Sequence, residues 1–224
     1  MENGDTIIGD SWQNELVIIP NPGTTNEYYL FSMGETSAVP QKGFFYSKIN
    51  MSLNGGLGRV VQKNVRLNTF RNADCVTAIK HGNGRDWWAI SKYSTNNTNF
   101  NRTYVYLVTN DSIHSPIIQN LNDATDGDVQ RIIFNSNGTK FMQINAAGYM
   151  AEYEFDRCSG IISNPQIIFP EQSGPYNRTF WNGAYSPDNS KFYVSTELYD
   201  LSINDTSWLV QYNLISSNIP GSAD

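Results

Sequence analysis

The stretch IFNSNGTKFMQIN at residues 133–145 decides the fold, because its pattern recurs three more times along the chain. It begins with apolar and aromatic residues, passes through a turn rich in Asn and Gly, and ends in an aromatic-led, strand-forming run. The same pattern appears in IIPNPGTTNEYYLFS (18–32), IKHGNGRDWWAIS (79–91) and AYSPDNSKFYVST (184–196). Turn residues that accept positive φ between two strand-forming runs predict a β-hairpin in each case.

A second strand-forming run follows each hairpin. In residues 150–156, Glu152 and Glu154 alternate with Tyr153 and Phe155, which is the period of a half-buried strand. A turn and a short apolar run come next, so each unit of about 50 residues holds three or four strands. The equivalent runs are FFYSKINM (44–51), YVYLVTND (104–111), MAEYEFD (150–156) and WLVQYNL (208–214).

Units of this kind are typical of an all-β propeller with WD40-like or YVTN-like blades. One blade cannot bury both faces of its sheet alone, so blades pack face to face. We therefore expect Tyr28, Trp87, Phe141 and Phe192, which share one blade position, to pack in the core. The sequence predicts a single domain over 1–224, as a partial or small ring of about four blades, with approximate bounds 16–70, 74–121, 127–170 and 180–218.

The last predicted blade is one strand short. Residues 5–9 are a candidate for the missing strand, which would close the ring. If the ring stays open, exposed blade edges tend to pair with another chain, so a dimer through open edges is the alternative.

Composition excludes several classes of partner. Charged residues make up 16% of the chain, the net charge is −6, and the 15 Lys and Arg are scattered singly. Nucleic-acid binding requires a basic patch, so no nucleic acid is expected as a partner. No apolar run approaches the length of about 20 residues that spans a bilayer, so membrane insertion is not expected.

Six motifs occur in order along almost the whole chain: IIPNPGTTNEYYLFS, INMSLNGGLGRVV, IKHGNGRDWWAIS, YVYLVTNDSI, EFDRCSGIISNP and YSPDNSKFYVST. They resemble the large propeller region of secreted Bacteroidetes surface proteins, which carry PKD-like domains and a sorting domain of the type IX secretion and gliding systems. The resemblance implies a secreted or cell-surface binding or scaffold domain, with the signal and sorting regions outside this chain, and a longer propeller of which this is about four blades.

Metal and cofactor sites have weak support. Neither histidine has metal-ligand spacing, and no cofactor motif is present, so no cofactor is expected. The segment 122–128 carries Asp123, Asp126 and Asp128, which are candidates for a calcium loop, although a surface acidic loop is the simpler interpretation. Cys75 and Cys158 are interpreted as two free thiols, with a disulfide as the alternative.

The most functional-looking residues lie on one hairpin. His81, Arg85 and Asp86 surround the turn Gly82-Asn83-Gly84, and Trp88 follows. They are candidate ligand-binding residues, with Trp88 as a platform for a sugar ring. The simpler interpretation is that the polar side chains hold the turn and that the tryptophan packs.

No catalytic motif is recognisable, so the first hypothesis is a non-enzymatic binding propeller for polysaccharide or another surface protein. The alternatives are a carbohydrate-active lyase or hydrolase with a central-channel site, and a passive scaffold in a large adhesin. Clustered carboxylates in the structure would favour the enzyme, since glycoside hydrolysis uses two of them.

Overall fold

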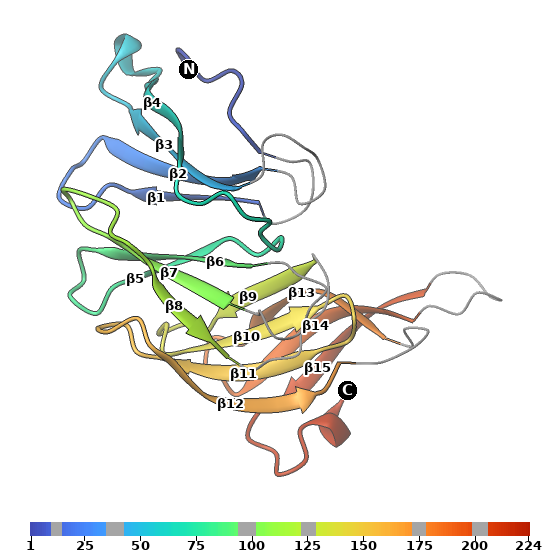
Figure 1. Ribbon diagram of the computed structural model, residues 1–224. Coiled ribbons are helices and arrows are strands. Elements are labelled where there is room, and N and C mark those ends of the chain that lie inside the picture. Colours follow the sequence, from blue (N-terminus) through green and yellow to red (C-terminus); the bar gives the residue numbers. More distant parts are fainter. Residues whose placement is uncertain (10–14, 35–42, 94–101, 122–128, 172–177, 199–205) are drawn as a thin grey trace. The chain divides into compact units, whose positions relative to one another are not determined.

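The computed structural model describes residues 1–9, 15–34, 43–93, 102–121, 129–171, 178–198 and 206–224. These residues form four antiparallel sheets, three of four strands and one of three (Figure 1). Within the described part of the chain, no helix is long and apolar enough to cross a membrane. The strands are β1 Leu16–Pro20, β2 Glu27–Gly34, β3 Gly43–Asn50, β4 Arg59–Arg66, β5 Thr77–Lys80, β6 Trp87–Lys92, β7 Arg102–Val108, β8 Ile117–Asn120, β9 Gln130–Phe134, β10 Lys140–Asn145, β11 Met150–Phe155, β12 Ile162–Phe169, β13 Thr179–Tyr185, β14 Lys191–Leu198 and β15 Thr206–Asn213.

The strand register gives the four repeated aromatic residues one structural position. Each lies opposite the last residue of the preceding strand, in the pairs Pro20 with Tyr28, Lys80 with Trp87, Phe134 with Phe141 and Tyr185 with Phe192. Successive side chains of a strand point to opposite faces. We call the face with these four residues the aromatic face of its sheet. The other face, which carries Tyr29, Trp88, Met142 and Tyr193, is called the opposite face.

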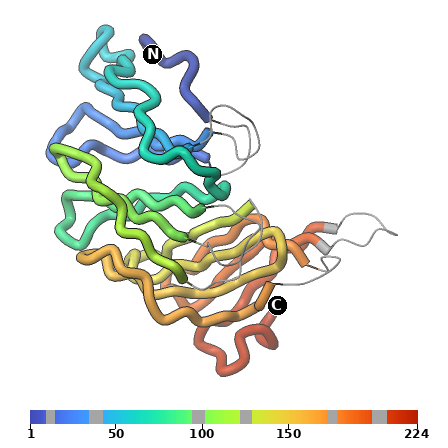
Figure 2. Tube along the Cα trace, viewed as in Figure 1, coloured from blue at the N-terminus to red at the C-terminus, as the bar shows by residue number. Residues whose placement is uncertain are grey.

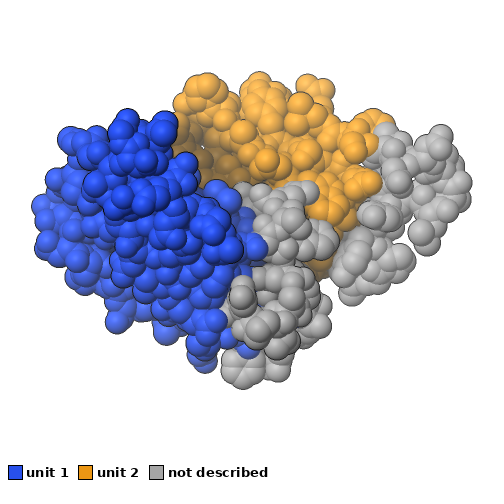
Figure 3. Space-filling view, turned by 90° about the horizontal axis from the view of Figure 1, so that it is seen from above, with its two compact units in different colours: residues 1–94, 102–119, 157–160 blue, residues 95–101, 120–156, 161–224 orange. Residues whose placement is uncertain are grey.

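The chain divides into two compact units, coloured separately in Figure 3. Unit 1 comprises residues 1–94, 102–119 and 157–160, and therefore holds the β1–β4 and β5–β8 sheets. Unit 2 comprises residues 95–101, 120–156 and 161–224, and holds the β9–β12 and β13–β15 sheets.

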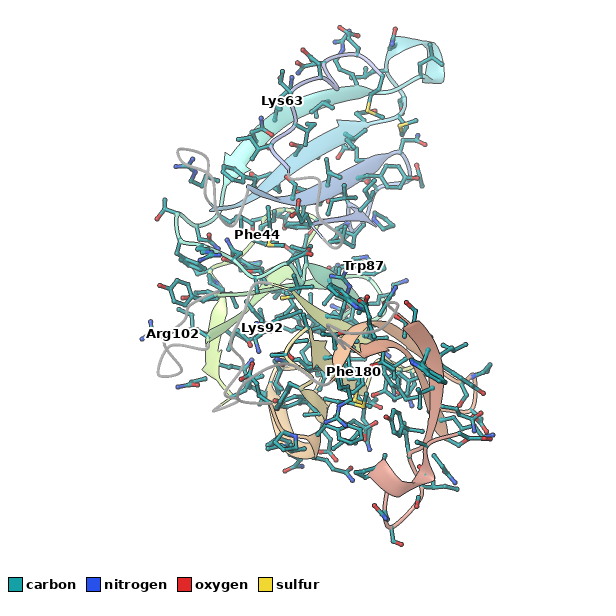
Figure 4. All side chains as sticks on the ribbon, turned by 90° about the vertical axis from the view of Figure 1, so that its right-hand side faces the viewer. Phe44, Lys63, Trp87, Lys92, Arg102 and Phe180 are labelled. Atoms are coloured by element: carbon teal, nitrogen blue, oxygen red, sulfur yellow. The ribbon has the colours of Figure 1, made fainter. Side chains whose placement is uncertain are left out.

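Each unit has a core made by two sheets packed face to face. In unit 1, Tyr29, Phe31 and Phe44 of the first sheet pack with Ala89 and Tyr106 of the second. In unit 2, the core consists of Met142, Ile144, Met150, Ile168, Phe180, Phe192, Val194, Tyr212 and Ile219. Phe44 and Phe180, labelled in Figure 4, belong to these two cores. The expectation that the repeated aromatic residues pack in the core is confirmed for Phe141 and Phe192, which are 0% exposed. Trp87 is partly buried against the core of unit 1, whereas Tyr28 is half-buried and is not among the residues of that core.

Residues 2–8 lie along β4, the outer strand of the first sheet (Figure 2). Glu2 exchanges backbone hydrogen bonds with Gly58 and Val60, and the side chain of Asn64 bonds both Thr6 and Ile8. The expectation that residues 5–9 complete the last blade is therefore wrong, because their hydrogen-bonding partners belong to the first sheet.

The last sheet has three strands among the described residues, as expected. Its outer strand β15 is partly covered by the residues that follow it. Asp224 and Gln211 exchange two backbone hydrogen bonds, and Ser222 Oγ accepts one from the backbone N of Asn213. These contacts give donors and acceptors on this strand edge a partner within the chain.

The turn between β13 and β14 is held by the carboxylate of Asp188. It accepts hydrogen bonds from the hydroxyl of Ser186 and from both the backbone N and the hydroxyl of Ser190. These donors, Ser186 first, lower the pKa of Asp188 from its usual 3.8 to about 2. A depressed pKa means that the stabilisation is fully present above the usual pKa and is lost as the pH falls below it.

We expect Phe192→Ala to lower the free energy of unfolding by about 3–5 kcal/mol, because it leaves a cavity in the core of unit 2. Ile167→Ala, at a side chain that is 58% exposed, should cost at most about 1 kcal/mol. Chemical denaturation monitored by tryptophan fluorescence measures both. Equal losses would contradict the assignment of Phe192 to the core.

We expect Asp188→Asn to lower the melting temperature at neutral pH, because the amide replaces a charged acceptor of three donors. The difference from the wild-type chain should shrink as the pH falls from about 4 toward 2, where the wild-type carboxyl becomes protonated. Thermal melts at a series of pH values test this. A difference that stays constant down to pH 2 would show that Asp188 does not titrate with a depressed pKa.

Candidate functional site

A polar hollow of about 270 Å³ opens within unit 2, where the turns of its two sheets meet. The β9–β10 turn, the β13–β14 turn and the segment after β15 form its rim. Strands β10, β11 and β12 contribute one side chain each. The lining residues are Asn135, Asn137, Thr139, Lys140, Glu152, Gln166, Asn189, Leu214 and Ile215.

Side-chain amides build the two turns of the rim. Asn135 Oδ1 accepts hydrogen bonds from the backbone N of Thr139 and Lys140, at 3.1 Å each. Asn189 has a φ of 60°, which asparagine tolerates better than most residues. Its Oδ1 accepts from the backbone N of Ser136, and its Nδ2 donates to the hydroxyl of Ser136. The two turns are therefore tied together across the hollow.

A carboxylate with two donors lies at the base of the hollow. Glu152 has a side chain that is only 9% exposed. Lys140 Nζ donates to its Oε2 at 2.7 Å, and the hydroxyl of Tyr185 donates to its Oε1 at 3.0 Å. Gln166 stands directly opposite Glu152 on β12. The buried charge is thus compensated by one ion pair and one neutral hydrogen bond, as a buried carboxylate requires.

The hydroxyl of Tyr185 stays protonated in this setting. Burial, together with the neighbouring charge of Glu152, raises the pKa of Tyr185 well above its usual value of 10.0. The protonated hydroxyl can therefore donate to Glu152 at neutral pH. Each oxygen of Glu152 accepts one hydrogen bond, which fixes the position of the carboxylate and leaves acceptor capacity for a further donor.

A second hollow of about 280 Å³ shares Thr139 and Lys140 with the first. It is lined by Glu154, Phe155, Asp156 and Ser163 as well. Glu154 accepts a hydrogen bond from Asn164 Nδ2 at 2.6 Å. Within the described ranges, no group of three His, Cys, Asp or Glu side chains converges as metal ligands do.

The predicted polar residues of the β5–β6 hairpin bond one another. Arg85 donates from Nε and Nη2 to the two oxygens of Asp86, at 2.8 and 3.0 Å. Asn83 Nδ2 donates to the same carboxylate, and its backbone N donates to His81 Nδ1. Hydrogen bonding to Arg85 is the main cause that lowers the pKa of Asp86. These contacts stabilise the turn itself.

Trp88 is 3% exposed, and its Nε1 donates to the backbone O of Arg157 at 2.8 Å. Its ring therefore packs inside the protein and offers no surface on which a sugar could stack. Cys75 is buried and Cys158 is exposed, and no disulfide joins them, which agrees with the interpretation without a disulfide. The calcium candidates Asp123, Asp126 and Asp128 lie outside the described residues.

The sequence analysis did not select Lys140 and Glu152 as candidate site residues, although one pattern in the sequence includes Lys140. The residue before each repeated aromatic is charged: Glu27, Asp86, Lys140 and Lys191. Three of these interact with a diagonal partner on the next strand. Lys48 bonds Glu27, Glu152 bonds Lys140, and Gln211 bonds Lys191.

No protein-family model matches the chain, and no curated protein matches it. Among solved structures, it is similar to puromycin hydrolase, with a TM-score of 0.51 and 12% identity over 96% of this chain and 31% of that one. It is also similar to a luciferin-regenerating enzyme (TM-score 0.47, 10% identity, 90% and 59% covered) and to a bifunctional GH43-CE of Bacteroides eggerthii (0.45, 14%, 100% and 28%). The chain spans less than two thirds of each. At these identities the likeness shows the fold alone, and the chain is an all-β protein of β-propeller-like fold.

Proposed function

We propose that this chain is a non-enzymatic binding module that holds an uncharged, hydroxyl-rich ligand, such as one sugar unit of a polysaccharide, in the hollow of unit 2. The observation that carries the proposal is the arrangement of four amide side chains around the compensated pair of Lys140 and Glu152. The amides belong to Asn135, Asn137, Gln166 and Asn189.

The chemistry of the lining suits a sugar. Amides and a fixed carboxylate can donate to and accept from the hydroxyl groups of one ring, while Leu214 and Ile215 supply an apolar wall. The charges of Lys140 and Glu152 cancel, so the hollow does not favour an anion or a cation. Its volume of about 270 Å³ lies just below the range for ligand pockets, about 300–1,000 Å³, which favours one ring over a larger molecule.

The acidic and phenolic side chains of the hollow favour binding over catalysis. Glycoside hydrolysis uses a pair of carboxyl groups, whereas Glu152 is the one acidic residue among the described residues that line this hollow. Tyr185, with its raised pKa, is a poor proton donor for acid catalysis at neutral pH.

We also propose that the chain forms a propeller, or part of one, at the cell surface. The meander order of the four sheets supports a propeller of about four blades or an arc of a larger one. Export to the cell surface is supported by the resemblance of six sequence motifs to secreted propeller proteins, and polysaccharide is the ligand class expected there.

We expect the purified chain to bind neutral glycans on an array, and Glu152→Gln to weaken that binding at least about tenfold, or about 1.4 kcal/mol. The substitution breaks the ion pair that positions Lys140. The matched control is Glu27→Gln, which breaks the equivalent ion pair with Lys48 in unit 1. Titration calorimetry with the best array oligosaccharide gives the dissociation constants.

Three outcomes would overturn the proposal. Silence across the array would remove glycans as the ligand class. An equal loss in the Glu27→Gln chain would place the site elsewhere. Appearance of cleaved oligosaccharide during the titration, measured by mass spectrometry, would make the chain a hydrolase.

We also expect EDTA to leave glycan binding unchanged. The described lining of the hollow offers one carboxylate, and its charge is already paired with Lys140, whereas a calcium ion is held by several oxygen ligands. The same titration in EDTA and in excess calcium measures this. Loss of binding in EDTA that calcium restores would show that a metal ion takes part.

A further inference from the structure

The polar hollow around Glu152, which we call the first hollow, adjoins the second hollow of unit 2 on one face of the β9–β12 sheet. Glu152 and its partner Gln166 line the first hollow. Glu154 and its partner Ser163 line the second. The two glutamates are separated by one residue on β11, so their side chains point to the same face of the sheet. The two hollows are therefore neighbours along β11.

Thr139 and Lys140 line both hollows and form the boundary between them. On the side of the first hollow, the backbone N of Thr139 donates to Asn135 Oδ1, and Lys140 Nζ donates to Glu152. On the side of the second hollow, the backbone O of Thr139 accepts from the backbone N of Phe155 at 2.8 Å. The boundary is thus fixed by contacts with both linings.

An irregularity in β12 positions the carboxylate of the second hollow. One residue separates Glu152 from Glu154 on β11, whereas two residues separate their partners, Gln166 and Ser163, on β12. An extra residue of this kind is a β-bulge, which re-aims a side chain. Asn164 lies in the bulge with a φ of 49°, and its Nδ2 donates to Glu154 Oε2 at 2.6 Å. The bulge therefore holds Glu154 in place.

The second hollow offers hydrogen-bond acceptors. Glu154 and Asp156 contribute carboxylates to its lining, and Ser163 contributes a hydroxyl. Glu154 is exposed, and since an ionised carboxylate has about four acceptor sites, it retains capacity for a ligand. Lys140 lies opposite Glu154 in the register, but its Nζ bonds Glu152 instead. This lining suits the hydroxyl groups of a neutral sugar and disfavours an acidic one.

We propose that the two hollows are adjoining subsites for two successive units of one neutral polysaccharide chain. This inference rests on the proposed function, because the first hollow is the sugar site proposed above. Each hollow alone lies just below the range for ligand pockets, about 300–1,000 Å³, whereas the two together lie within it. The bond between the two sugar units lies over the boundary of Thr139 and Lys140.

Two subsites make affinity depend on the length of the glycan. A disaccharide makes contacts in both hollows and loses its translational and rotational freedom only once, so it binds more tightly than a monosaccharide. A third unit reaches neither hollow and adds little. The protein therefore recognises a stretch of two units within a longer chain.

Titration calorimetry with three neutral saccharides tests the proposal. The probes are the monosaccharide, disaccharide and trisaccharide with the composition of the strongest neutral glycan on the array. We expect the disaccharide to bind at least about tenfold more tightly than the monosaccharide, and the trisaccharide to bind within about threefold of the disaccharide.

Glu154→Ala removes an acceptor from the second subsite. We expect it to lower the ratio of the monosaccharide dissociation constant to the disaccharide dissociation constant at least about threefold. Asn50→Ala is the matched control, because Asn50 lies opposite Glu27 in the first sheet as Glu154 lies opposite Lys140 in the third. This control should leave the ratio unchanged, and thermal melting checks that both variants stay folded.

The outcomes separate this inference from the proposed function. A monosaccharide and a disaccharide that bind equally to the wild-type chain would overturn the two subsites and leave the proposed function standing. A ratio that Glu154→Ala does not change, or that Asn50→Ala lowers equally, would place the second unit elsewhere and also overturn the inference. If none of the three saccharides binds, the proposed function fails and this inference fails with it.

Discussion

The packing of an opposite face onto an aromatic face is the contact on which the rest of this structure depends. A sheet of three or four strands has two faces, and water contact on both would leave Phe31 or Phe192 exposed. Because an apolar side chain of this size stabilises the fold by about 1.5–3 kcal/mol when it is buried, each sheet requires a neighbour. The hollow of unit 2 exists because the turns of two sheets held in this way meet above their shared core.

An ion pair recurs at the same strand position in the first and third sheets, and its surroundings differ between the two. The pair Glu27 and Lys48 in the first sheet becomes Lys140 and Glu152 in the third, with the two charges exchanged. The Glu27 side chain is 23% exposed and also accepts hydrogen bonds from Asn21 and Asn50. Glu152 is more deeply buried, and its further donor is Tyr185, which comes from another sheet. The same strand position thus holds a partly buried ion pair in one sheet and lines a polar hollow in another.

The sequence predicted the sheets far better than the site. Phe141 and Phe192 follow turn residues at regular spacing, so their role could be read from the chain alone. The pairing of Lys140 with Glu152 depends on strand register and on a tyrosine from another sheet, which no local pattern reveals. His81 and Arg85 drew attention as unusual residues, but Arg85 bonds Asp86 within the hairpin and the ring of His81 bonds the backbone O of Cys158, so both have structural partners. Residues 5–9 were misplaced because strand-forming tendency does not specify which edge a segment joins.

The segments that lie along β4 and β15 also have a dynamic consequence. They are held by hydrogen bonds at the outer edge of a sheet, such as those of Glu2 with Gly58 and of Asp224 with Gln211. Local opening of such segments requires less free energy than unfolding of a core. Their amide protons should therefore exchange with solvent before those of the central strands. Each opening uncovers a strand edge in an otherwise native molecule, so fibril-like association of this fold would begin from the folded state rather than from the unfolded chain.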